Sequence, residues 1–119
     1  MPVDLRRNGM FGSKTSKIEK LAAKKNSDQL VKFLSDKDPA VRLAAIKGLG
    51  QAGGEPAFNS LVALLRDSNA NMREAAASAL EVLKDSKSCA FLSARVKDET
   101  DEKVKAAMNR ALKAAQNRL

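Results

Sequence analysis

The chain has 119 residues and a net charge of +8, and its 44% hydrophobic and 30% charged residues are typical of one compact domain rather than a disordered segment. No apolar run is long enough to cross a bilayer, and the first residues lack the apolar core of a secretory signal, so we expect a cytoplasmic protein without a transmembrane segment. The absence of histidine and the single cysteine exclude the usual general base near neutral pH, an internal disulfide and a paired-cysteine metal site. We therefore expect no catalytic residue, no bound metal and no cofactor.

The N-terminal region is expected to hold one helix that covers the end of a single domain at 14–119. Residues 1–13 show no hydrophobic periodicity, which predicts a flexible segment. Ser16 and Glu19 have the spacing of a capping box, and apolar residues follow at helical spacing, which predicts a helix over 16–25. Its lysines at helical spacing would share one side: Lys14, Lys17, Lys20 and Lys24.

The rest of the chain repeats itself with a period of about 31 residues. The stretch LVKFLSDKDPAVRLAAIKGLG at 30–50 aligns with LVALLRDSNANMREAAASALE at 61–81. A third copy, LSARVKDETDEKVKAAMNRALK at 92–113, keeps this offset through Asp98 and then takes up one extra residue in the turn. The alignment predicts three units, which span residues 27–54, 55–85 and 86–117.

Each unit reads as two helices because apolar residues recur every three or four positions on both sides of a turn. In the first unit, Asp38 is a suitable N-cap for the second helix and Pro39 falls at its first position. Asn69 and Thr100 would cap the equivalent helices, and Ser86 the first helix of the third unit. The pattern predicts an all-α fold, a short α–α superhelix of about three helix pairs plus an N-terminal capping helix.

The stretch DKDPAVRLAAIKGLG at 36–50 resembles the second helix of a HEAT repeat. More narrowly, it is similar to the short bacterial and archaeal HEAT-like repeats first named after phycobilisome lyases. The resemblance covers residues 16–117 and implies an α-solenoid with first helices on the convex side and second helices on the concave side. It is specific for the fold and nearly silent on function, because the family includes scaffolds, bilin lyase subunits and DNA glycosylases.

Acidic and basic side chains recur once per unit at the turn between the two helices. The acids are Asp36, Asp67 and Asp98, and the bases are Arg42, Arg73 and Lys105. A cation at a helix N-terminus opposes the helix dipole and so needs a compensating partner. The resemblance implies that such pairs form a ladder between neighbouring repeats, so we assign these residues a structural role.

Specificity is expected on the concave face, which second-helix residues beside the buried stripe would line. These residues are Leu43, Lys47, Glu74, Ser78, Glu81, Arg110 and Lys113. Cys89 aligns with Phe58 of the preceding unit, which predicts a buried apolar role rather than a reactive thiol.

Three functions fit these patterns. The first is a non-catalytic interaction module or scaffold that binds a protein or peptide on its concave face. The second is nonspecific electrostatic nucleic-acid binding through the basic ends, because residues 1–25 hold seven basic and two acidic side chains and residues 86–119 hold eight and four. The third is an accessory subunit of a bilin lyase-like enzyme, which the resemblance alone implies.

Overall fold

The described part of the chain is built from helices joined by short turns. The computed structural model describes residues 14–117, so the flexible segment predicted for 1–13 lies outside the described residues. An N-terminal helix, described from 14 to 23, comes first. The elements that follow are α2 (Ser27–Lys32), the 3-10 turn η1 (Phe33–Ser35), α3 (Pro39–Ala52), α4 (Glu55–Leu64), α5 (Ala70–Leu83), α6 (Ser88–Asp98) and α7 (Glu102–Gln116). The predicted all-α repeat fold is confirmed.

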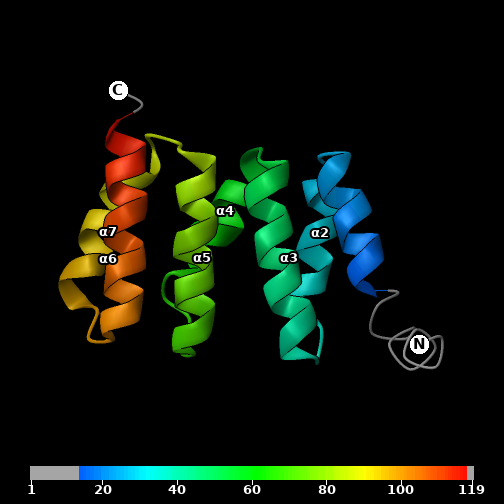
Figure 1. Cartoon of the computed structure of the whole chain (residues 1–119), viewed down its shortest axis with the longest axis horizontal. Helices are drawn as coiled ribbons and strands as arrows, with labels where there is room; N and C mark the ends of the chain where they lie inside the picture. The colour runs from blue at the N-terminus through cyan, green and yellow to red at the C-terminus, as the bar shows by residue number, and fades with distance from the viewer. Residues whose placement is uncertain (1–13, 118–119) are drawn as a thin grey trace, which may run out of the picture.

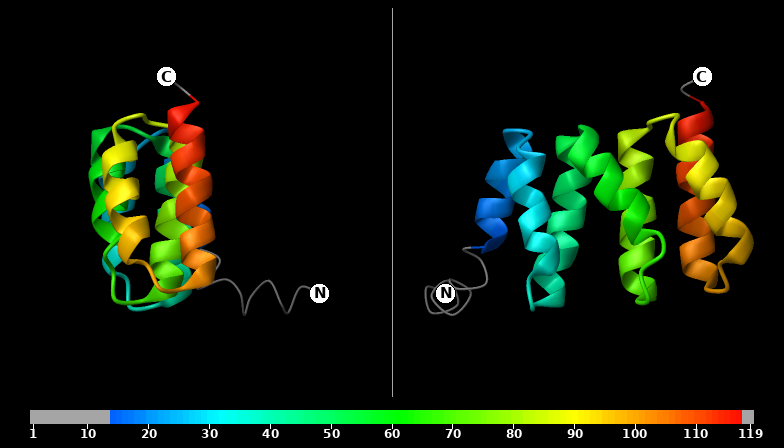
Figure 2. Two further views of the ribbon diagram at one scale, coloured as in Figure 1. Left: turned by 90° about the vertical axis from the view of Figure 1, so that its left-hand side faces the viewer. Right: turned by 180° about the vertical axis from the view of Figure 1, so that it is seen from behind.

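The helices form two layers, one of first helices and one of second helices. In Figure 1 the second helices α3, α5 and α7 stand side by side, and the left view of Figure 2 shows both layers end-on. The N-terminal helix lies beside the first helix pair. The described molecule measures 46 × 29 × 23 Å. No helix of residues 14–117 is long and apolar enough to cross a membrane.

Each second helix begins at a residue whose side chain accepts from backbone N–H groups of the first turn. Asp38 accepts from Ala40 at 2.9 Å, and Asn69 accepts from Asn71 at 2.8 Å. In the third unit the cap is Asp101, which accepts from Lys103 and Val104, so the prediction of Thr100 as the cap is wrong by one residue. These bonds satisfy amides that have no partner inside the helix.

Small residues bring the second helices close together. A Cβ atom on Gly50 would lie 3.0 Å from the Cα, Cβ and carbonyl oxygen atoms of Ala79, which places α3 and α5 in backbone contact at this point. Alanines at equivalent depths, including Ala45 and Ala76, are fully buried. The core therefore combines close approach of the second helices with buried leucine, isoleucine and methionine side chains.

The N-terminal helix differs from the prediction at both ends. Residues 14 and 15 are already helical, so Ser16 lies inside the helix instead of capping it. The helix ends at residue 23, where Lys25 adopts a left-handed conformation (φ 58°) and the Asn26 N–H donates to the Leu21 carbonyl at 2.9 Å. This six-to-one bond is that of a Schellman motif, which stops a helix sharply.

The first helix of the third unit also begins differently. α6 starts at Ser88, and the preceding turn is closed by Asp85, whose carboxylate accepts from the Lys87 N–H at 2.9 Å, so Ser86 is not the cap. Cys89 is half-buried rather than buried. Its counterpart Phe58 is covered by α6, where the Phe91 ring lies 6.0 Å away, whereas no further first helix follows α6 among the described residues.

Candidate interaction surface

The predicted arginines bond first to the turn of their own repeat. Arg42 donates from Nη1 to the Asp36 carbonyl at 2.7 Å, and Arg73 makes the same bond to the Asp67 carbonyl at 2.7 Å. The Asp36 carboxylate accepts from the Asp38 N–H at 2.9 Å, and the Asp67 carboxylate accepts from the Asn69 N–H at 2.9 Å. Each arginine and each aspartate therefore stabilises the backbone of a tight turn.

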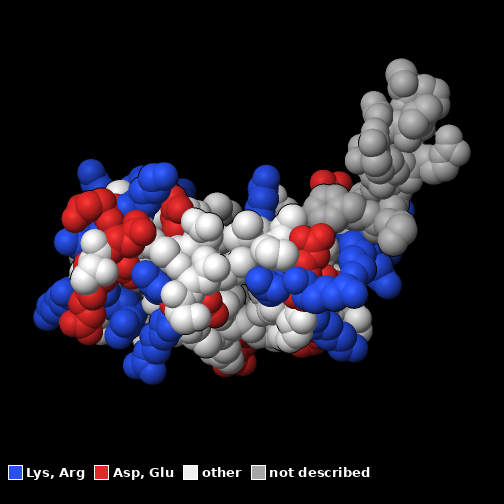
Figure 3. Space-filling model, turned by 90° about the horizontal axis from the view of Figure 1, so that it is seen from below, with Lys and Arg blue, Asp and Glu red and all other residues white. Residues whose placement is uncertain are grey.

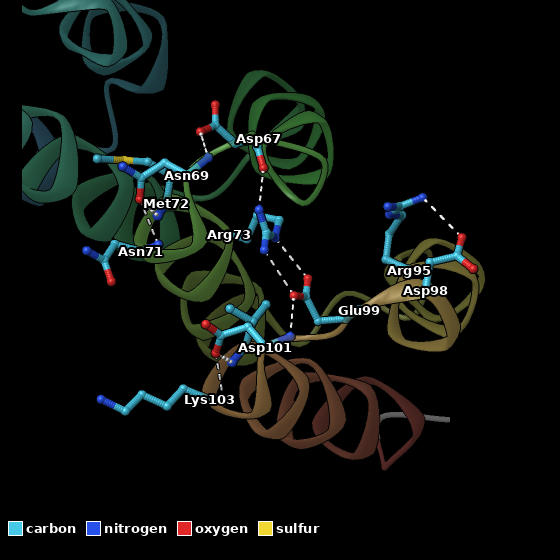
Figure 4. A network of polar contacts seen from close by, with 11 residues as sticks. Asp67, Asn69, Asn71, Met72, Arg73, Arg95, Asp98, Glu99, Asp101 and Lys103 are labelled. Atoms are coloured by element: carbon cyan, nitrogen blue, oxygen red, sulfur yellow. Dashed lines mark hydrogen bonds and ion pairs between the residues drawn. The ribbon is translucent and has the colours of Figure 1, made fainter.

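Arg73 makes a further contact that joins two repeats. Its Nε and Nη2 atoms donate to the two carboxylate oxygens of Glu99 at 2.9 and 3.0 Å, as Figure 4 shows. The Arg73 side chain is 18% exposed and that of Glu99 is 5% exposed, so the pair is largely shielded from water. Glu99 also accepts from the Asp101 N–H at 3.0 Å. The second repeat is thereby tied to the turn of the third.

The environment shifts the titration of both partners. Hydrogen bonds from the Arg73 guanidinium hold the pKa of Glu99 below its usual value, although burial opposes this shift. The same hydrogen bonds raise the pKa of Arg73. At the first turn, the pKa of Asp36 is lowered, chiefly by the hydrogen bond from the Lys14 ammonium 2.8 Å away. Lys14 therefore links the N-terminal helix to the first repeat.

The expected ladder differs in the third repeat. Asp98 is 72% exposed and lies 3.7 Å from Arg95 of its own helix, and Lys105 lies 3.8 Å from Glu102 of its own helix. Glu99, not Asp98, takes the place of Asp36 and Asp67, because it accepts the N–H bond that closes the turn. The extra residue of the third repeat therefore lies before Glu99, and the predicted assignment of Asp98 to the ladder is wrong.

The outward side of α5 and α7 carries most of the predicted concave-face residues. Glu74, Ser78 and Glu81 recur along α5, and Arg110 and Lys113 along α7. The Arg110 Nε atom lies 3.5 Å from Glu81 Oε1, so an ion pair bridges the two helices on this side. We call this surface, together with its two hollows, the α5–α7 groove.

A hollow lies at each end of the α5–α7 groove. The hollow near the C-terminal ends of the helices has a volume of about 480 Å³ and is lined by Glu81, Lys84, Arg110, Lys113, Ala114 and Asn117. The hollow near the N-terminal ends has a volume of about 290 Å³ and is lined by Ala70, Asn71, Glu74, Asp101, Glu102, Lys103 and Val104. We call them the basic hollow and the acidic hollow.

The neighbouring part of the second-helix layer is less charged. Leu43 of α3 is half-buried, and Lys47 is exposed one turn further along. On α5, Val82 is 61% exposed, although it is a large apolar residue. Since Val82 follows Ser78 by four residues, both side chains lie on the outward side of the helix.

Charge is distributed unevenly over the ends of the array. Seen from the end where the second helices begin, acidic and basic side chains mix at the α6–α7 end, the middle is largely uncharged, and basic side chains gather toward the N-terminal helix (Figure 3). Lys17, Lys20 and Lys24 are all exposed on that helix. Among residues 14–117, no three histidine, cysteine or carboxylate side chains are grouped as metal ligands would be.

Sequence reasoning missed several groove residues. Lys84 and Lys103 were not among the predicted contacts, although each lies one or two helical turns from a predicted residue: Glu81 precedes Lys84 by three positions, and Arg110 follows Lys103 by seven. Continuing the helical spacing past both ends of the stripe would have found them. Glu99 was missed because the position of the inserted turn residue was misjudged.

Comparison with known proteins agrees with this architecture. A family model described as HEAT repeats matches residues 21–113, which is most of the chain. No curated protein matches the sequence.

Proposed function

Because the chain belongs to the HEAT-repeat family, we propose that it is a non-catalytic interaction module that binds a protein or peptide on the outward face of α3, α5 and α7. Proteins of this family generally mediate protein interactions as scaffolds. Stacked repeats present a continuous surface, and affinity then comes from the length of that surface rather than from one chemical group.

The observations that carry this proposal are the hollow of about 480 Å³ between α5 and α7 and the exposed Val82 on α5. An exposed apolar residue and a hollow with charged walls in the same helix layer offer a partner both an apolar contact and polar specificity. By contrast, Arg42 and Arg73 donate hydrogen bonds to backbone carbonyls of the turns in their own repeats, so they stabilise the fold.

Peptide phage display followed by NMR mapping tests the proposal. Peptides selected against the folded chain are expected to perturb the amide signals of outward residues on α3, α5 and α7. Val82→Asp is expected to weaken binding at least tenfold, because it places a charge in the apolar contact. Ala63→Asp is the matched control, since Ala63 is also exposed near the end of its helix but belongs to the first-helix layer. Perturbations confined to α2, α4 and α6, or equal effects of the two variants, would refute the proposed face.

Nucleic-acid binding through the basic ends remains a second candidate, which the exposed lysines of the N-terminal helix favour. Lys17, Lys20 and Lys24 would follow a phosphate backbone without reading its sequence. A gel shift with random duplex DNA tests it: retardation that fades as salt rises is expected, and no retardation at low salt would exclude it. The accessory role beside a bilin lyase-like enzyme stays a prediction from resemblance.

A further inference from the structure

The two hollows of the α5–α7 groove carry opposite charge. The basic hollow gathers Lys84, Arg110 and Lys113 against the single carboxylate of Glu81, which leaves two positive charges in excess. The acidic hollow gathers Glu74, Asp101 and Glu102 against Lys103, and Lys105 lies 3.8 Å from Glu102, which leaves one negative charge in excess. One groove therefore has a positive end and a negative end.

Helix dipoles account for only part of this arrangement. The macrodipole favours negative charges in the first turn of a helix and positive charges in the last, which explains Asp101 and Glu102 at the start of α7. Arg110 lies almost two turns before the end of α7, beyond the reach of that rule. The C-terminal ends of two helices contribute about half a negative charge each, which offsets about half of the positive excess and leaves the basic hollow positive.

The polar groups of the basic hollow are only partly engaged with one another. Glu81 meets Arg110 at 3.5 Å, a long contact that leaves most of the guanidinium donors unused. Among the described residues, the ammonium groups of Lys84 and Lys113 form no ion pair. A carboxylate that entered the hollow would meet three cations, whereas a cation would meet a site already in positive excess.

The spacing of the hollows sets the length of the occupant. Lys103 and Arg110 are seven residues apart on α7, and Lys113 is three residues further, so the two ends are separated by about 10–15 Å at 1.5 Å per residue. An extended peptide covers this distance with about three to five residues.

We propose that the α5–α7 groove binds an extended peptide segment of a protein partner whose acidic and basic residues are separated into two groups about four residues apart. The acidic group lies in the basic hollow, on Lys84, Arg110 and Lys113, and the basic group lies in the acidic hollow. This inference rests on the proposed function and names the chemistry of the segment that the second-helix face selects.

Two peptides of identical composition test the inference. The first, acetyl-Lys-Lys-Ser-Ser-Glu-Glu-amide, separates its charges; the second, acetyl-Lys-Glu-Ser-Ser-Lys-Glu-amide, does not. Titration of the isotope-labelled full chain, followed by NMR, is expected to give about tenfold tighter binding of the first peptide, with amide shifts at both hollows. Equal binding of the two peptides, absence of binding, or shifts elsewhere would overturn the inference.

Matched charge reversals assign the binding to the groove. Lys84→Glu with Lys113→Glu is expected to abolish the preference between the peptides, while Lys17→Glu with Lys20→Glu, the same change of charge on the N-terminal helix, is expected to leave it unchanged. Circular dichroism checks the fold, and Lys113→Gln replaces the double variant if that variant unfolds. If peptides from phage display bind the second-helix face but ignore these reversals, the charge rule is wrong and the interaction module stands. If none binds that face, the module itself is refuted.

Discussion

Replacement of Arg73 by alanine isolates the contact that joins the second and third repeats. The change removes two hydrogen bonds to Glu99 and one to the Asp67 carbonyl, and it leaves a carboxylate that is 5% exposed without its cation. Removal of one partner from a buried pair costs about 3–5 kcal/mol. Because Arg73 is 18% exposed, water can enter the vacated space, and we expect a loss of about 2–4 kcal/mol in the free energy of unfolding.

Arg42→Ala is the internal control for this measurement. Arg42 makes the same bond to a turn carbonyl but forms no ion pair among the described residues, so its loss is expected to cost about 0.5–1.5 kcal/mol. Urea unfolding of both variants at pH 7, followed by circular dichroism, gives the two free energies. Equal losses would refute the reasoning, because the pair with Glu99 would then contribute nothing to stability.

The acid dependence of stability provides a second readout of the same pair. The pKa of Glu99 is lowered in the folded protein, so its contribution is fully present above the unfolded value of about 4.3 and is lost as pH falls through the lower folded value. The wild-type chain is therefore expected to lose stability in that window. Arg73→Ala removes the cause of the lowered pKa, and the stability lost in this window is expected to shrink accordingly.

Three further predictions concern stability and are measured by thermal unfolding. Gly50→Ala is expected to destabilise the fold by about 1–3 kcal/mol, because its Cβ would lie 3.0 Å from the backbone of Ala79; an unchanged melting temperature would mean that α3 and α5 separate at little cost. Lys25→Gly is expected to stabilise by about 0.5–1 kcal/mol, since glycine accepts the left-handed conformation without steric cost, and a lower melting temperature would contradict this. Asp98→Ala is expected to change the free energy of unfolding by less than about 0.5 kcal/mol, while Glu99→Ala is expected to cost at least about 2 kcal/mol. A larger loss for Asp98→Ala than for Glu99→Ala would support the predicted alignment, in which Asp98 is the equivalent of Asp36 and Asp67.

The repeat architecture could be predicted because helix starts and helix faces leave a clear pattern of capping and apolar residues in the sequence. Asp38 and Asn69 cap helices where their side chains and the apolar period together predict a helix start. The third turn was less certain, because Asp98 and Glu99 are both acidic and Thr100 and Asp101 are both good caps. In the structure Glu99 closes the turn and bonds Arg73 of α5, and Asp101 caps α7.

The charge pattern of the groove was only partly predictable. The alignment placed Glu81 and Arg110 on the outward side of their helices, but the contact between them depends on the rotation and distance of two helices. Sequence spacing shows which residues share one face of a single helix, whereas the lining of a hollow depends on how two helices are placed relative to each other. Burial of Cys89 was misjudged for a related reason, since no helix follows α6 to cover it among the described residues.

Both joints of the array are packed by apolar residues, but only one of them adds ion pairs. Arg73–Glu99 and Arg110–Glu81 connect the second and third repeats, whereas no ion pair connects the first and second repeats within residues 14–117. The first joint depends on apolar contact around Gly50, which neither acid nor salt weakens directly. We therefore expect acidification to weaken the joint between the second and third repeats and to leave the joint between the first and second repeats unchanged.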